Sequence, residues 1–167
     1  MLHVALKTAF EGQPSLTRAL QSLGQPDGGE YAEVDWIKSE GDLEDEILMA
    51  ARRLRPTLVF IQTQRRTPIT PATIEHLRRV SDPSRCVIVN WDGDQHHEPG
   101  DKQRRWFVEL GQVCDASLMV NTKHPAEYAA MSVRGAGYLQ IGVDNVYQLR
   151  PQIAGIPEVV FLASAYE

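Results

Sequence analysis

Short apolar runs alternate with amphipathic segments along most of the chain. The runs at residues 58–61 and 86–89 contain only apolar side chains, which is typical of strands buried on both faces of a sheet. Between them, leucine, isoleucine and alanine recur at helical spacing, for example from Leu43 to Leu54. Alternation of this kind indicates βα units assembled into a parallel sheet. The pattern predicts an α/β fold, specifically a three-layer α/β/α Rossmann-like domain with a mainly parallel sheet of about six strands.

Strand and helix boundaries follow from the same pattern. Ser15, Asp42 and Thr70 stand where helix N-caps are expected, and Pro71 after Thr70 suits the first helical position. The more polar second strand is expected nearer an edge of the sheet. The expected strands are residues 2–6, 31–36, 58–61, 86–89, 116–120 and 138–141, and the expected helices are 15–24, 43–54, 71–80, 102–111 and 124–131.

Two parts of the chain are distinguished by their regularity. Residues 1–150 are expected to form the Rossmann-like domain, and residues 151–167 a linker. Within that linker, the apolar run 159–162 is a candidate first strand of a second domain.

Composition narrows the class of protein. The 167 residues are 43% hydrophobic, enough for one full core, and only Cys86 and Cys114 are present, which argues against a disulfide framework. Seventeen basic and 22 acidic residues give a net charge of −5, which disfavours binding of nucleic acid or anionic membranes through bulk charge. No signal peptide and no membrane-length apolar run is evident. A cytoplasmic protein is expected, and a homo-oligomer is left open.

Loops that follow the strands are expected to gather at one edge of the sheet, where open α/β sheets bind their ligands. The loop at residues 90–101 is the richest in acids and imidazoles. Asp92 lies nearest the strand end and is the first catalytic candidate, with His96 as a general base. Asp94 and His97 are candidate substrate-binding residues in the same loop. Metal binding by these side chains and a plain polar turn are the alternatives.

Further candidates come from the other loops of this edge. Arg65 can meet a phosphate or carboxylate, with Gln62 and Gln64 as hydrogen-bond partners. Trp91, in the loop at residues 90–101, and Asn121, after the strand at 116–120, complete the candidate substrate-binding set. No G-x-G-x-x-G, Walker A or G-x-S-x-G motif occurs, so tight dinucleotide or ATP binding and serine hydrolysis are not indicated.

Four segments, read in order, resemble a known family. They are residues 89–94 (VNWDGD), 106–111 (WFVELG), 118–121 (LMVN) and 135–144 (GAGYLQIGVD). Their order and spacing resemble the N-terminal half of CgeB-like glycosyltransferases with the two-domain GT-B architecture, over roughly residues 56–165. A departure is that the run 159–162 leads into Ala163 and Ala165 rather than a glycine-rich turn.

The resemblance implies an acceptor-binding domain. In such enzymes the nucleotide-sugar donor lies mainly in the C-terminal domain and the acceptor, which carries a hydroxyl group, mainly against the N-terminal one. Asp92 and Asp94 would then face the cleft, and residues 142–144 would approach the interdomain linker. No cofactor is expected in this domain itself, no metal is obligatory, and no turnover is expected without the donor domain.

Two other functions remain open. One is a non-catalytic flavodoxin-like module that binds a ligand or a protein at the same edge. A receiver-like version of it is weakened by Thr8-Ala9 and Gln62-Thr63, which stand where acidic residues would be needed. The other is a metal-dependent hydrolase built on Asp92 and Asp94, which would be stabilised by magnesium or manganese.

Overall fold

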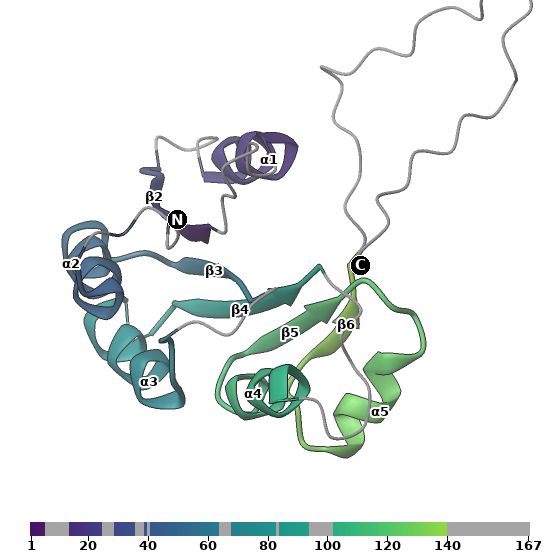
Figure 1. Ribbon diagram of the computed structural model, residues 1–167. Helices are drawn as coiled ribbons and strands as arrows, with labels where there is room; N and C mark the ends of the chain where they lie inside the picture. The colour runs from purple at the N-terminus through teal and green to yellow at the C-terminus, as the bar shows by residue number, and fades with distance from the viewer. Residues whose placement is uncertain are drawn as a thin grey trace, which may run out of the picture.

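Six parallel strands form a single sheet at the centre of the computed structural model, which describes residues 1–5, 14–24, 29–35, 39, 41–63, 68–82, 84–93 and 102–139. The strand order is β2-β1-β3-β4-β5-β6 (Figure 1). The strands are β1 (Leu2–Ala5), β2 (Ala32–Asp35), β3 (Leu58–Gln62), β4 (Val87–Asp92), β5 (Ala116–Met119) and β6 (Ala136–Tyr138). The helices are α1 (Pro14–Gly24), α2 (Leu43–Leu54), α3 (Pro71–Val80), α4 (Lys102–Gly111) and α5 (His124–Ala130). The predicted three-layer, Rossmann-like α/β fold is confirmed.

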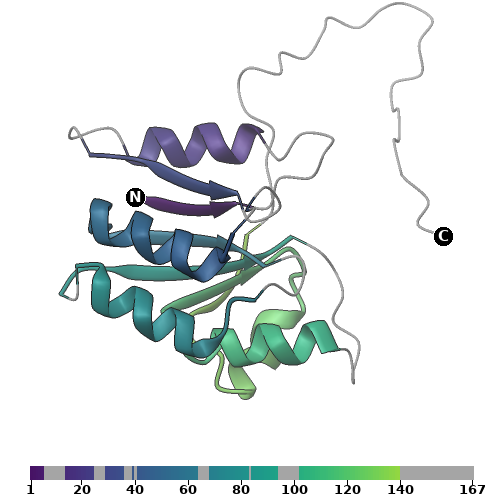
Figure 2. The same cartoon turned by 60° about the vertical axis from the view of Figure 1, so that its left-hand side comes forward.

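Helices cover the two faces of the sheet unequally. Helix α1 lies on one face, and α2 to α5 lie on the other (Figures 1 and 2). The more polar strand β2 is an edge strand, as predicted, and β3 lies between β1 and β4. The direction of strand addition reverses at β1, because the chain first adds β2 on one side and then crosses to add β3 on the other. In open α/β sheets ligands bind beside such a reversal, at the carboxyl ends of the strands.

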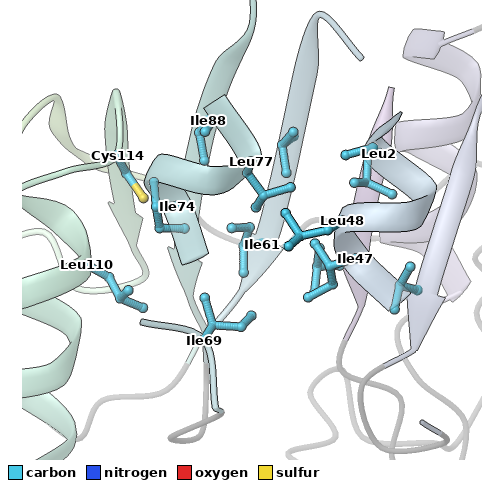
Figure 3. Packing of buried hydrophobic residues seen from close by; sticks show 14 of the residues in the cluster. Leu2, Ile47, Leu48, Ile61, Ile69, Ile74, Leu77, Ile88, Leu110 and Cys114 are labelled. Atoms are coloured by element: carbon cyan, nitrogen blue, oxygen red, sulfur yellow. The ribbon is translucent and has the colours of Figure 1, made fainter. Parts of the chain in front are cut away.

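The main hydrophobic core lies between the sheet and helices α2 to α4. Strands β1, β3 and β4 contribute Leu2, Ile61 and Ile88, all 0% or 1% exposed. Helix side chains at spacings of three and four residues pack against them because this spacing repeats on one helix face. Figure 3 shows part of this core, to which the following buried residues belong: Leu2, Ile47, Leu48, Ile61, Ile69, Ile74, Leu77, Ile88, Leu110 and Cys114.

Two of the three predicted helix caps are confirmed. The Asp42 carboxylate accepts from the backbone N–H of Glu44 at 2.9 Å, and the Thr70 hydroxyl accepts from that of Thr73 at 3.2 Å. The prediction for Ser15 is wrong, because α1 already begins at Pro14. A proline at a helix start has its φ preset and lacks an N–H that would find no partner there.

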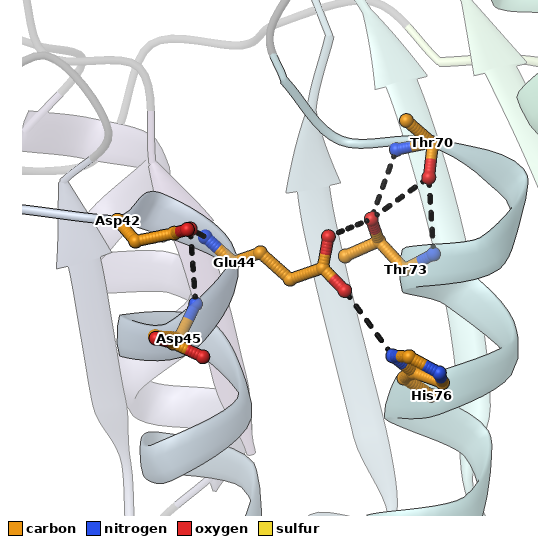
Figure 4. A network of polar contacts seen from close by, with 6 residues as sticks. All are labelled: Asp42, Glu44, Asp45, Thr70, Thr73 and His76. Carbon is orange, nitrogen blue, oxygen red and sulfur yellow. Dashed lines mark hydrogen bonds and ion pairs between the residues drawn. The ribbon is translucent and has the colours of Figure 1, made fainter.

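A polar network joins α2 to α3 near their N-termini (Figure 4). Glu44 of α2 accepts from the Thr73 hydroxyl at 2.9 Å and lies 3.2 Å from the His76 imidazole. Thr73 is itself part of the capping box with Thr70, so the start of α3 and the side chain of Glu44 order one another. The two helices are thereby held side by side along the sheet.

Most strands differ from their predicted bounds by at least one residue, and the differences are largest for β4 and β6. Strand β4 continues to Asp92 because β3 and β5 both pair with its last residues, so Asn90 and Trp91 belong to the strand and not to a loop. Strand β6 begins at Ala136, not at residue 138, because Gly135 turns the chain at φ 50° and pairing with Ser117 follows directly. The expected linker at 151–167 and its run 159–162 lie outside the described residues. None of the described helices has the length and the apolar character of a membrane span.

Candidate functional site

Asp92 ends strand β4 at the carboxyl edge of the sheet and is fully buried. Its register partner on β5 is Met119. Because side chains alternate along a strand, Asp92 and Asn90 share the face of Ile88, which belongs to the core under α2 to α4. Asp92, the first catalytic candidate, therefore lies on the face of the sheet that α2 to α4 cover.

Thr63, directly after β3, connects to this part of β4. Its hydroxyl donates to Oδ1 of Asn90 at 2.5 Å, and its backbone N–H donates to the carbonyl oxygen of Trp91 at 2.8 Å. Both Thr63 and Asn90 are 0% exposed. Hydrogen bonds between buried groups are strengthened by the low local dielectric, so this contact holds the Asn90 amide in one orientation.

Helix α4 closes over the same edge. Gln103, in its first turn, donates from Nε2 to the carbonyl oxygen of Thr63 at 2.8 Å. One turn further, the indole of Trp106 donates to the carbonyl oxygen of Ile69 at 3.0 Å. These two bonds tie α4 to the chain that follows β3, so the polar ends of β3 and β4 lie beneath the start of a helix.

Two buried polar atoms in this layer have no hydrogen-bond partner in the described part of the chain. They are Nδ2 of Asn90 and Oγ of Ser117, and the two residues are register partners on β4 and β5. The Ser117 hydroxyl lies under the last turn of α4, against Gly111. Unpaired buried polar atoms are rare and costly, so they mark this layer as a place with spare hydrogen-bonding capacity.

A second polar cluster lies on the opposite, α1 side of the sheet. His3 of β1 is 0% exposed and its Nε2 lies 2.9 Å from Oε1 of Gln62. Its Nδ1 lies 2.9 Å from the Tyr31 hydroxyl and 3.4 Å from a Glu33 oxygen. Gln62, a predicted substrate-binding residue, is thus engaged within the fold and is 2% exposed.

The direction of the bonds in this cluster follows from Tyr31. Its hydroxyl donates to Glu33 at 2.9 Å, so it can only accept from Nδ1 of His3. The Nε2 of His3 faces the Gln62 side-chain amide, which completes the cluster on this side of the sheet. Burial, and then the hydrogen bond to Glu33, raise the pKa of the Tyr31 hydroxyl well above its ordinary value.

The side chains of Trp91 and Asn121 each form a hydrogen bond with a backbone group of the fold. Trp91 is 1% exposed, packs near Phe60 and Leu20, and donates from its indole to the carbonyl oxygen of Leu139 at 3.2 Å. Asn121 accepts from the backbone N–H of Lys123 at 2.9 Å, which shapes the turn into α5. The structure brings Asp92, Trp91 and Gln62 to one edge, and Asn121 follows β5 nearby in the sheet order.

The other predicted site residues lie outside the described residues. They are Gln64, Arg65, Asp94, His96 and His97. Among the residues that are described, no group of three or more histidine, cysteine, aspartate or glutamate side chains is placed to hold a metal ion. Cys86 and Cys114 are buried free thiols, and burial raises the pKa of both, that of Cys114 to about 12.

Sequence reasoning missed Thr63, Asn90 and His3 as members of polar clusters. A signal was present for two of them, since Asn90 directly extends an apolar strand run and His3 interrupts another. A polar residue in a strand buried on both faces needs an internal partner. The partner itself, 27 residues from Asn90 and 59 from His3, has no local signature.

Comparison with known proteins gives no assignment. No protein-family model, no curated protein and no solved structure matches this chain.

Proposed function

We propose that this chain forms the acceptor-side, N-terminal domain of a nucleotide-sugar-dependent glycosyltransferase with the two-domain GT-B architecture. The observation that carries the proposal is the position of Asp92, a fully buried carboxylate at the last residue of β4. It stands at the carboxyl edge of an all-parallel sheet, where folds of this class bind ligands. A carboxylate there suits a hydroxyl-bearing acceptor, since it can accept the hydroxyl hydrogen bond and then the proton.

The residues around Asp92 support a polar ligand. Asn90 is oriented by Thr63 through its Oδ1, which leaves two N–H donors on Nδ2 without a described partner. Amide donors beside a carboxylate acceptor match the mixed donors and acceptors of a sugar or polyol hydroxyl. His96, the second catalytic candidate, lies outside the described residues.

In the proposed enzyme the donor belongs to a second domain. No glycine-rich nucleotide-binding motif occurs in this sequence. This agrees with an enzyme in which this domain binds the acceptor and the second domain binds the donor. Transfer requires the acceptor hydroxyl and the sugar carbon to be held together in one orientation, so the activity belongs to the two-domain protein.

The test uses the complete product of the gene that encodes this chain. It is incubated with a panel of nucleotide sugars, and release of the nucleoside phosphate is followed with and without hydroxylated acceptors. We expect sugar consumption with at least one donor, and a loss of about 100-fold or more in kcat for Asp92→Asn, as for removal of a general base. Asp45→Asn, an exposed carboxylate in the first turn of α2, is the matched control and should leave kcat unchanged.

Thermal unfolding of both variants separates chemistry from stability. Full turnover by Asp92→Asn would remove Asp92 from the mechanism. If the complete gene product consumes no nucleotide sugar, the glycosyltransferase proposal fails, and the non-catalytic binding module becomes the better account of this edge.

A further inference from the structure

Arginines gather at the edge of the sheet opposite the candidate site. Helices α2 and α3 run side by side, and their C-terminal ends lie where the strands begin (Figure 2). The last turn and cap of α2, the last turn of α3 and the turn before β4 each contribute to the group. Its exposed members are Arg52, Arg53, Arg55, Arg79 and Arg85. We call these five arginines, together with the exposed Met49, the arginine surface.

Arg78, also in the last turn of α3, is an arginine with a structural role. Its guanidinium donates to Asp115 at 3.1 Å and to the carbonyl oxygen of Val113 at 3.0 Å, and the Asp115 carboxylate raises its pKa. None of the five guanidiniums of the arginine surface makes a hydrogen bond or ion pair within the described residues. They therefore hold no neighbouring element in place.

Two members of the arginine surface lie near the same carboxylate. Asp82 lies between α3 and β4, and its carboxyl pKa is lowered first by hydrogen bonds from Ser84 and then by the charges of Arg85 and Arg55. Arg55 is the C-cap of α2 and Arg85 follows α3, so the Asp82 carboxylate interacts with one arginine beyond each of the two helices. The Glu44 bridge to Thr73 and His76 keeps the two helices together.

Favourable helix dipoles explain only part of this charge. Each helix C-terminus carries about half a negative charge, so two helices account for about one unit, against five guanidiniums. Met49 adds an apolar element, since it is 60% exposed and lies three and four residues before Arg52 and Arg53, on the same helix face. Arginine and methionine are enriched at protein interfaces.

We propose that the arginine surface is a docking site for a carboxylate-rich protein partner. Guanidinium groups bind carboxylates through two parallel hydrogen bonds, and Met49 would contact the apolar part of the partner beside them. None of the large hydrophobic side chains exposed on the α2 and α3 ends, among those described, is aromatic, which disfavours single-stranded nucleic acid because it binds by base stacking. The net charge of −5 does not oppose the docking, because charges on the far side are screened beyond about 8 Å at physiological salt.

The probe is fluorescently labelled poly-L-glutamate, and binding is followed by anisotropy at physiological salt. The variant Arg52→Gln/Arg53→Gln/Arg79→Gln should bind at least about tenfold more weakly. The matched control, Lys102→Gln/Arg105→Gln/Lys123→Gln, changes the net charge equally with exposed residues elsewhere and should bind within about twofold of the original chain. Replacing Arg52, Arg53 and Arg79 by lysine keeps the charge and should still weaken binding, because lysine lacks the two-pronged donor.

Three results would overturn the proposal. The first is equal weakening by the two glutamine variants, which would mean attraction by bulk charge alone. The second is full binding by the lysine variant, which would mean that the two-pronged guanidinium contact plays no part. The third is tighter binding to duplex DNA or to vesicles rich in phosphatidylglycerol than to poly-L-glutamate, which would assign the surface to a phosphate-bearing partner instead. Unfolding curves recorded for each variant show that the fold is retained, as expected for exposed side chains.

Discussion

Gln62 and Thr63 are neighbours in the chain, yet their side chains serve polar clusters on opposite faces of the sheet. Gln62 meets His3 at 2.9 Å beneath α1, whereas Thr63 donates to Asn90 at 2.5 Å beneath α4. The alternation of side chains along a strand makes this division unavoidable. Side chains at the carboxyl end of β3 therefore make hydrogen bonds on both faces of the sheet, at the edge where the candidate site lies.

Removal of the Gln62 amide should destabilise the fold through the polar cluster on the α1 side of the sheet. In Gln62→Ala the buried Nε2 of His3 loses its hydrogen-bond partner, which should lower the free energy of unfolding by about 1–3 kcal/mol. Urea denaturation measures the change. Gln112→Ala removes an exposed glutamine that donates to the Met131 carbonyl and should cost less than about 0.5 kcal/mol. Equal costs for the two variants would contradict a buried network at His3.

Thr63→Val should destabilise the other side of the edge. The substitution keeps the shape of the side chain but removes the hydroxyl, so Asn90 is left with an unpaired oxygen as well as an unpaired Nδ2. We expect a loss of about 1–3 kcal/mol in the free energy of unfolding. Thr122→Val, at an exposed position in the turn before α5, is the control and should be nearly neutral. An unchanged unfolding midpoint for Thr63→Val would contradict the assigned hydrogen bond.

A methyl group at residue 111 should clash with Val133 and destabilise the fold. A Cβ at residue 111 would lie 2.7 Å from Cγ1 of Val133 and 2.8 Å from Oγ of Ser117, closer than such atoms pack. Gly111→Ala should therefore cost about 1–3 kcal/mol despite the better helix propensity of alanine. Val133→Ala alone should also be destabilising.

The double variant of this pair gives the decisive comparison. Gly111→Ala with Val133→Ala places the new methyl group into the space that the valine leaves. Its loss of stability should be smaller than the sum of the two single losses by about 1 kcal/mol or more. Simple additivity in urea denaturation would show that the two residues do not press on one another.

Cys114 should make the fold sensitive to alkaline pH. Burial raises its thiol pKa from an ordinary 9.0 to about 12, so above pH 9 the unfolded chain loses this proton while the folded chain keeps it. Stability from this group is complete below pH 9 and is lost as pH rises toward 12. The original chain should therefore lose more stability over this range than Cys114→Ala, by an amount on the order of a few kcal/mol. Parallel curves of unfolding free energy against pH would contradict this account.

Much of the architecture could be predicted because it depends on local periodicity. Apolar runs of strand length and helices with one apolar face recur without interruption, and Asp42 and Thr70 mark helix starts through their own side chains. The polar character of β2 also correctly predicted an edge strand. These features are decided within a few residues of chain, so spacing alone reveals them.

The ends of the strands were predicted less well because pairing decides them. Strand β4 reaches Asp92 only because Gln62 of β3 and Met119 of β5 stand beside its last two residues. Backbone groups that find partners on both sides stay extended, whatever turn-forming residues follow in the sequence. For Ser15, the choice between a cap and a helical residue depended on Pro14, whose ring favours the helix start.

The sequence by itself determined the α/β class, the parallel sheet and the buried strands, because these arise from hydrophobic periodicity. Only the tertiary structure decided that Gln62 contacts His3, that Thr63 binds Asn90 and that Arg55 and Arg85 lie near Asp82. These contacts join residues far apart in the chain, and strand order and register select them. Register depends on how whole faces of the sheet are buried, so a polar partner becomes known only once every strand has its neighbours.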